Sequence, residues 1–179
     1  YTRNRVGRCF LRLKEYEVAI AEFLKASESA SDPKDKARTL YNAGITYNKL
    51  KQYQNAISVL EVSVQLNPEN VNTWESLIGA HFNMQDYGQV QAVGIEGLQK
   101  FPNNQYMLNL VGGSFEQQGD VTQAETYYQA AIQGTEHDKH PLYNLAEMYE
   151  TQEKHELAIE FLDRIIEIDP EYGNAWYLK

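Results

Sequence analysis

The stretch Leu40-Tyr41-Asn42-Ala43-Gly44-Ile45-Thr46-Tyr47 decides the fold, because copies of its pattern return along the chain at a nearly fixed interval. Steps of 34 residues lead to three later copies and then to Trp176, and a step of 37 leads back to an earlier copy. Five copies at such regular spacing establish an internal repeat. The recurring positions, copy by copy, hold Gly7, Phe10, Ala19 and Phe23; Leu40, Gly44, Tyr47, Ala56 and Leu60; Trp74, Leu77 and Val90; Leu108, Gly112, Phe115, Ala124 and Tyr128; and Leu142, Ala146, Tyr149, Ala158 and Leu162.

Each copy has the pattern of two helices joined by a tight turn. Apolar residues recur at steps of three and four, which places them on one helical face, and a short polar turn such as Gly119-Asp120 separates two such stretches. We expect a small residue of the first helix, such as Gly44, to meet a small residue of the second, such as Ala56, so that the axes approach closely. The second helix should end before Asn67-Pro68, Phe101-Pro102 and Asp169-Pro170, because proline cannot continue it.

These residues resemble the tetratricopeptide repeat family, whose unit carries Trp or Leu, Leu-Gly, Tyr, Ala, Phe or Tyr, Ala and Pro in this order. The resemblance covers essentially the whole chain and implies an all-α, right-handed superhelical solenoid of antiparallel helical hairpins. First helices would line a concave groove and second helices the convex back. We expect ten full helices, a short eleventh and no strands, in a single solenoid over 1–179. Its repeats would lie at about 1–36, 37–70, 71–104, 105–138 and 139–172, with the start of a sixth at 173–179.

Both ends of the sequence look cut. The chain begins at Tyr1 rather than at a methionine, and the sixth repeat stops partway through its first helix. No polar terminal helix follows to cap the stack. We therefore expect the native protein to continue in both directions.

The third repeat departs from the pattern. Ile78 stands where a small residue is expected, His81 and Phe82 straddle the aromatic position, and the second helix carries three glycines, Gly88, Gly94 and Gly97. Three helical glycines cost roughly 3 kcal/mol relative to alanine. Two interpretations stay open: a hinge or close-approach site for a partner, and a divergent repeat that its neighbours hold in shape.

Charge is distributed unevenly along the chain. Residues 1–51 hold eleven Lys and Arg against six Asp and Glu, whereas residues 52–179 hold five against nineteen. This asymmetry favours oriented association with a charged partner or with neighbouring repeats. The acidic majority argues against nucleic-acid binding, and the apolar runs are too short for membrane insertion.

No set of residues predicts catalysis, so we expect neither an enzyme nor a bound cofactor. Glycine-rich phosphate loops are absent, and Gly112-Gly113-Ser114 lacks the final glycine of a nucleophile elbow. His137 and His140 have no third ligand nearby, so we expect no metal. The single cysteine, Cys9, is expected to be a small core residue. A single cysteine excludes an internal disulfide framework. The absence of an Asn-x-Ser/Thr sequon disfavours a glycosylated exterior, so a cytoplasmic location is favoured, but the compartment stays unknown.

The resemblance also implies which side chains face the groove, as a stripe along each first helix. The stripe runs from basic, through polar and aromatic, to acidic. Asparagine amides suit the backbone of a bound peptide, and tyrosine rings suit its apolar side chains. The expected partner-binding residues are Arg5, Arg8, Arg12, Arg38, Tyr41, Asn42, Lys49, Phe82, Asn83, Tyr106, Asn109, Tyr143, Asn144 and Glu147.

The predicted function is therefore a non-catalytic protein–protein interaction scaffold or adaptor. It would hold an extended or helical segment of a partner in the groove, with acidic residues over the first two repeats. The alternative is a regulatory or substrate-recruiting module of a larger enzyme whose catalytic domain lies elsewhere. Self-association stays open, and no register supplies the basic set that grips chaperone tails.

Overall fold

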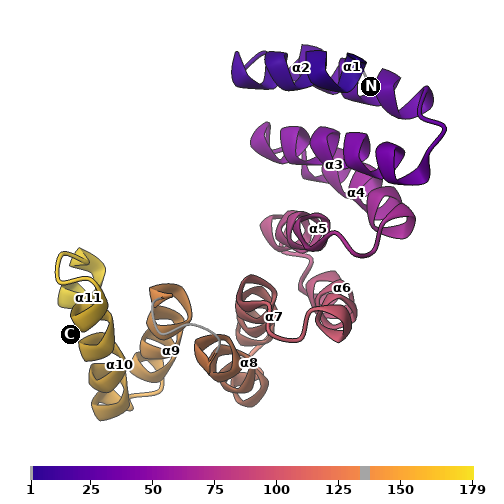
Figure 1. Ribbon diagram of the computed structural model, residues 1–179. Helices are drawn as coiled ribbons and strands as arrows, with labels where there is room; N and C mark the ends of the chain where they lie inside the picture. The colour runs from indigo at the N-terminus through magenta and orange to yellow at the C-terminus, as the bar shows by residue number, and fades with distance from the viewer. Residues whose placement is uncertain (1, 134–137) are drawn as a thin grey trace. The chain divides into compact units, whose positions relative to one another are not determined.

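The computed structural model describes residues 2–133 and 138–179, which form eleven α-helices and no strand (Figure 1). This confirms the all-helical prediction for the described part of the chain. The helices are α1 (Thr2–Arg12), α2 (Tyr16–Glu28), α3 (Pro33–Lys49), α4 (Tyr53–Leu66), α5 (Val71–Asn83), α6 (Tyr87–Lys100), α7 (Gln105–Gln117), α8 (Val121–Gln133), α9 (Lys139–Thr151), α10 (His155–Ile168) and α11 (Gly173–Leu178).

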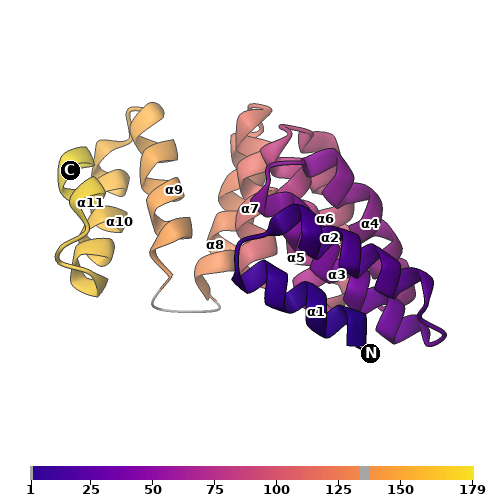
Figure 2. The same ribbon diagram turned by 90° about the horizontal axis from the view of Figure 1, so that it is seen from above.

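The chain divides into two compact units, Tyr1–Val93 and Gly94–Lys179, and the division falls inside α6. In the first unit each helix from α1 to α5 packs on the next, and α3 also touches both α1 and α5. In the second unit α7 to α11 pack in the same sequential way, and α7 also touches α9. Figures 1 and 2 both show α9 and α10 side by side. Within each unit, therefore, first helices of successive repeats are neighbours.

The turn inside every hairpin has the same backbone conformation. One residue of each turn has a positive φ, between 58° and 82°, and these residues lie at one repeat position: Lys14, Lys51, Gln85, Gly119 and Glu153. In each turn the next residue donates its N–H five residues back, for example Gln52 to Tyr47 at 2.9 Å. This is the Schellman arrangement, which satisfies the last carbonyls of the first helix. The predicted polar turns are thus confirmed.

The interval of 37 residues has a local cause at the start of α3. This helix has 17 residues, whereas α5, α7 and α9 have 13 each. Asp32 caps it by accepting the N–H of Asp35 at 3.0 Å, and Pro33 occupies the first turn, where its missing N–H costs nothing. The extra residues therefore lengthen α3 at its N-terminus and leave the hairpin unchanged.

The close approach of the two helices in three hairpins brings a glycine of the first helix against a large side chain of the second, and at Gly112 also against the backbone of the small residue Ala124. A Cβ atom at Gly7 would lie 2.6 Å from the Phe23 ring, and one at Gly44 would lie 2.5 Å from Leu60. At Gly112 the ring of Tyr128 would be 2.8 Å away. The small residues of the second helices are fully buried beside this contact: Ala19, Ala56, Ala124 and Ala158.

The prediction that Cys9 belongs to the core is wrong, because its side chain is exposed. The equivalent residues of later repeats, Thr46, Ala80, Ser114 and Met148, are all buried. Among the described helices, α1 packs on α2 and α3. Both lie away from the face that carries Cys9, so the apolar pattern of α1 is only partly used.

The glycines of α6 have different surroundings. A Cβ atom at Gly88 would meet nothing within 4 Å, whereas one at Gly94 would lie 2.3 Å from Cγ2 of Val111. Val111 is fully buried and its branched side chain is stiff, so it cannot give way easily. The glycine at 94 is therefore required by packing within the chain.

We predict opposite effects for two alanine substitutions in this helix. Gly88→Ala should raise the free energy of unfolding by about 0.5–1 kcal/mol, because only helix propensity changes. Gly94→Ala should lower it by about 1 kcal/mol, since overpacking against Val111 outweighs the gain in propensity. Urea unfolding monitored by circular dichroism measures both. Equal stabilisation by the two substitutions would contradict the packing role of Gly94.

Candidate functional site

The first unit carries a cluster of basic side chains, here called the basic face: Arg5, Arg8, Arg12, Arg38 and Lys49. The three α1 arginines are exposed and line one shallow hollow together with Cys9. Arg5 and Arg8 line a second hollow with Asn4 and Arg38, so α3 contributes an arginine to the α1 cluster. Lys49 is exposed at the end of α3 and lines neither hollow. The structure thus brings four of these five predicted groove residues together.

The basic face is only partly neutralised. Arg38 pairs with Asp35 at 2.6 Å, within the first turns of α3. In the part of the chain that the structure describes, Arg8, Arg12 and Lys49 have no carboxylate within ion-pair distance. The guanidinium groups of Arg8 and Arg12 on α1, together with the ammonium group of Lys49 on α3, create a positive potential that attracts carboxylates.

Polar side chains of neighbouring first helices are joined at one repeated pair of positions. Asn42 donates its amide N–H to Asn4 at 2.9 Å, and Asn144 donates to Asn109 at 2.9 Å. Tyr41 and Ser76 are in polar contact at the same two positions of the next junction, and the Ser76 hydroxyl donates to the Asn72 carbonyl of its own helix. These three contacts are called the polar rungs. Some of the asparagine hydrogen-bonding groups that we expected to bind a ligand therefore bond within the chain. Each side-chain amide still has further N–H donors or oxygen lone pairs.

The aromatic residues of the predicted groove differ in availability. Tyr106 is the most exposed, at 49%. Tyr41 is half-buried, and burial raises its pKa. Tyr143 packs edge-on against Tyr172 with ring centroids 6.0 Å apart.

The predicted residues at the end of α5 turn toward their own hairpin. Phe82 packs edge-on against Tyr87 at 5.8 Å. The Asn83 amide donates to the Gly79 carbonyl at 2.7 Å. His81, rather than Phe82, takes the buried aromatic position, and its Nδ1 lies 3.7 Å from Asp86. These two groove positions are therefore less free to meet a partner than those of α3, α7 and α9.

The second unit carries the acidic groups. Tyr128 donates its hydroxyl to Glu116 at 2.6 Å, and Glu147 stands exposed on the next first helix. Burial raises the pKa of Glu116, and the charge of Glu147 adds to this effect, against a lowering by the Tyr128 hydrogen bond. Burial, followed by the Glu116 carboxylate, raises the pKa of Tyr128. The acidic groups therefore repel one another in a partly buried setting.

Over residues 2–133 and 138–179, no three His, Cys, Asp or Glu side chains gather in a way that could hold a metal ion. His137 of the histidine pair lies outside the described residues. Its neighbour Asp138 caps α9 by accepting the N–H of His140 at 3.0 Å. None of the helices described is long and apolar enough to cross a membrane.

Sequence reasoning missed the role of Asn4 and Ser76. Both belong to the polar rungs, which join two different repeat positions across adjacent helices. The repeat pattern aligns identical positions, so it could not show which different positions meet. In the sequence, the only sign of a rung was a polar residue at both places of the three junctions that form one.

The chain belongs to the tetratricopeptide repeat family, because the family model matches residues 1–69 and 105–171. Among curated proteins it is similar to Pre-mRNA-splicing factor 6 of Saccharomyces cerevisiae, with 23% identity over 127 residues. That match covers 71% of this chain but only 14% of the splicing factor.

Solved structures share the fold at low sequence identity. MamA from Desulfovibrio magneticus RS-1 has a TM-score of 0.84 and 16% identity, with 96% of this chain and 95% of that chain covered. YrrB, described as a TPR protein with an unusual peptide-binding site, has a TM-score of 0.77 and 21% identity, over 98% and 89% of the two chains.

The family match leaves out residues 70–104, which coincide with the divergent third repeat. This region nevertheless forms the two helices α5 and α6. The third repeat therefore differs from the repeat pattern in its side chains and glycine content but keeps the two-helix hairpin.

We predict that the polar rung between Asn4 and Asn42 stabilises the first unit. In a double-mutant cycle with alanine at both positions, the coupling energy should be about 0.5–1.5 kcal/mol, the usual range for one partly buried hydrogen bond. Urea unfolding of the four proteins measures it. The control is the exposed hydrogen bond from the Asn55 amide of α4 to the side-chain oxygen of Gln52, the residue before that helix, at 3.1 Å; this pair should couple more weakly. A coupling energy of zero at Asn4 and Asn42 would show that the rung contributes nothing.

We predict that Glu116→Gln stabilises the chain at neutral pH. Because the folded-state pKa of Glu116 is raised, the folded chain favours the protonated form, and its stabilisation is lost as pH rises through that pKa. Glutamine keeps the acceptor for Tyr128 and removes the charge. The free energy of unfolding should therefore exceed that of the wild type at pH 7, and the difference should shrink toward pH 4. Urea unfolding at several pH values measures this. Glu160→Gln, at an exposed carboxylate of α10, is the control, and an equal gain there would contradict the argument.

Proposed function

We propose that this chain is a non-catalytic interaction scaffold that holds an extended or helical segment of a partner protein on the face made by its first helices. The observation that carries the proposal is the set of polar rungs. They tie neighbouring first helices together at 2.9 Å and leave tyrosine rings and unpaired cations beside them. Because the rungs already fix neighbouring first helices in the free protein, little conformational entropy is lost when a partner binds to this face.

The chemistry of the face supports a peptide-like ligand. Rings such as Tyr106 and Tyr143 can cover apolar side chains, while the remaining amide groups of the rungs can bond a backbone. The exposed arginines of α1 favour acidic residues over the first unit. The description of the structurally similar YrrB as having a peptide-binding site is in keeping with this proposal.

A selection from a random peptide display library tests the proposal. Peptides that bind the wild-type chain would be titrated against variants by fluorescence anisotropy. Tyr41→Ala, Tyr106→Ala and Tyr143→Ala should weaken binding, each by about 1–2 kcal/mol for a peptide that reaches that ring. The double reversal Arg8→Glu with Arg12→Glu should reduce both the association rate of acidic peptides and its dependence on salt.

Exposed apolar residues of second helices provide matched controls. Val62 on α4 is 39% exposed and Ile159 on α10 is 40% exposed. Val62→Ala and Ile159→Ala should leave the affinities unchanged. If these two variants abolish binding while the tyrosine variants do not, the second helices are the working surface and the proposal is wrong.

A further inference from the structure

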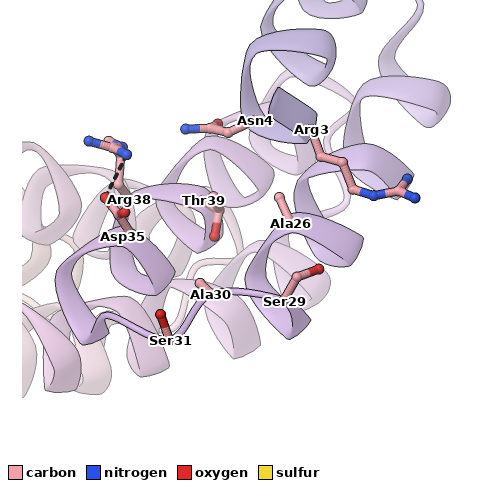
Figure 3. A pocket seen from close by; sticks show the side chains of 9 residues that line it. All are labelled: Arg3, Asn4, Ala26, Ser29, Ala30, Ser31, Asp35, Arg38 and Thr39. Atoms are coloured by element: carbon pink, nitrogen blue, oxygen red, sulfur yellow. Dashed lines mark hydrogen bonds and ion pairs between the residues drawn. The ribbon is translucent and has the colours of Figure 1, made fainter. Parts of the chain in front are cut away.

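A separate hollow of about 370 Å³ lies where the ends of α1, α2 and α3 meet. Figure 3 shows Ala26, Ala30 and Thr39 between two arginines, Arg3 and Arg38, that extend to opposite sides in this view. The hollow lies wholly within the first unit. It is of a size that accepts a side chain or a small ligand.

In the first repeat Arg3 stands where every later repeat holds a large apolar residue, namely Leu40, Trp74, Leu108 and Leu142. The fifth repeat also holds large residues at two further positions of the hollow, and it therefore represents the filled state. In the fifth repeat the positions of Arg3, Ala26 and Ser29 hold Leu142, Ile165 and Ile168. There Leu142 and Ile165 are buried in one apolar cluster, with Ile168 packed against it. Arginine, alanine and serine do not occupy the same space, and the arginine at the leucine position is 56% exposed on its side chain.

Two arginines and one carboxylate, that of Asp35, line the hollow together with two alanines, Ala26 and Ala30, and four uncharged polar residues. Arg3 pairs with Glu22 at 3.2 Å and Arg38 with Asp35 at 2.6 Å, yet each guanidinium has further N–H donors. The two hydroxyl groups of Ser29 and Thr39 already donate their hydrogen to backbone carbonyls, so a bound carboxylate would accept its hydrogen bonds from the arginines. Ser29 donates to the Lys25 carbonyl at 2.6 Å, and Thr39 donates to the Lys36 carbonyl at 2.9 Å.

The hollow adjoins the basic face. Asn4 and Arg38 line both this hollow and the one that contains Arg5 and Arg8. A ligand group in the hollow would therefore stand beside several guanidinium groups. The residues next to that group would have to be acidic or neutral, because a basic neighbour would be repelled.

We infer that the hollow is a side-chain pocket for a partner segment in which one apolar residue is flanked by acidic residues. The apolar side chain takes the space that leucine and isoleucine fill in the fifth repeat. The flanking carboxylates pair with Arg38 and with the α1 arginines. This inference rests on the proposed function and adds the chemistry of the bound segment.

Labelled synthetic peptides test the pocket directly. The probe is Gly-Glu-Glu-Leu-Glu-Glu-Gly, compared with the same peptide carrying alanine in place of leucine and with a lysine version, Gly-Lys-Lys-Leu-Lys-Lys-Gly. Anisotropy titrations of the full chain should show the leucine peptide binding about tenfold or more tightly than the alanine peptide, because a buried leucine gains apolar area. The lysine version should bind most weakly.

Filling the pocket should remove the preference for leucine. Ala26→Ile introduces the residue of the fifth repeat, and it should bring the affinity of the leucine peptide down to that of the alanine peptide. The same substitution at exposed Ala92 on α6 is the matched control and should change neither affinity. Ser29→Ile serves as a second filling variant if Ala26→Ile proves unfolded by circular dichroism.

The inference is overturned if the leucine peptide does not bind, if leucine and alanine peptides bind equally, or if a folded filling variant keeps the preference. The last two results would identify a hydrated void. They would leave the proposed function untouched, because the tyrosine variants and displayed peptides test the groove separately. If instead the tyrosine variants do not weaken the binding of displayed peptides while the preference for leucine remains, the proposed function is wrong and the pocket is supported.

Discussion

The contact on which the rest of the structure depends is the approach of a glycine backbone to a large side chain inside a hairpin. Gly7 against Phe23, Gly44 against Leu60 and Gly112 against Tyr128 leave no room for a Cβ atom. Because the ring or branched chain fills the groove beside the glycine, the two helices sit close and their spacing is set. The Schellman turns then fix the direction in which the second helix leaves. Each hairpin thus presents a well-defined first helix to the next repeat.

Neighbouring hairpins are joined by polar contacts as well as by the apolar core. The rungs Asn4–Asn42, Tyr41–Ser76 and Asn109–Asn144 lie at the edge of the buried layer, where side chains are half-covered. A hydrogen bond there gains strength from partial burial and still leaves polar groups for a ligand. The same residues therefore hold neighbouring hairpins together and belong to the face that we propose for partner binding. This explains why a stripe expected to serve a partner is also bonded within the chain.

The first and third repeats depart from the repeat pattern, and each departure changes the local packing. In the third repeat, Gly94 makes room for Val111, and the imidazole of His81 takes the buried aromatic position. The divergence therefore alters side-chain packing, while the two helices still form. In the first repeat, small and charged residues replace the apolar cluster around Leu142, and a hollow results. A repeat protein can tolerate such losses because stability is shared among neighbour contacts rather than concentrated in one core.

The sequence by itself determined the helices, the hairpins, the turn positions and the charge asymmetry, because each depends on local periodicity and on residues repeated at one interval. The resemblance to the repeat family predicted Arg5, Arg8 and Arg38 as groove residues, and the tertiary structure places these three around one hollow. The sequence could not show that Cys9 is exposed, since the face of a helix is buried only if another helix covers it. Nor could it show the polar rungs or the hollow at Ala26. Both arise between side chains at unlike repeat positions, whose meeting depends on the distance and offset of neighbouring helices in space.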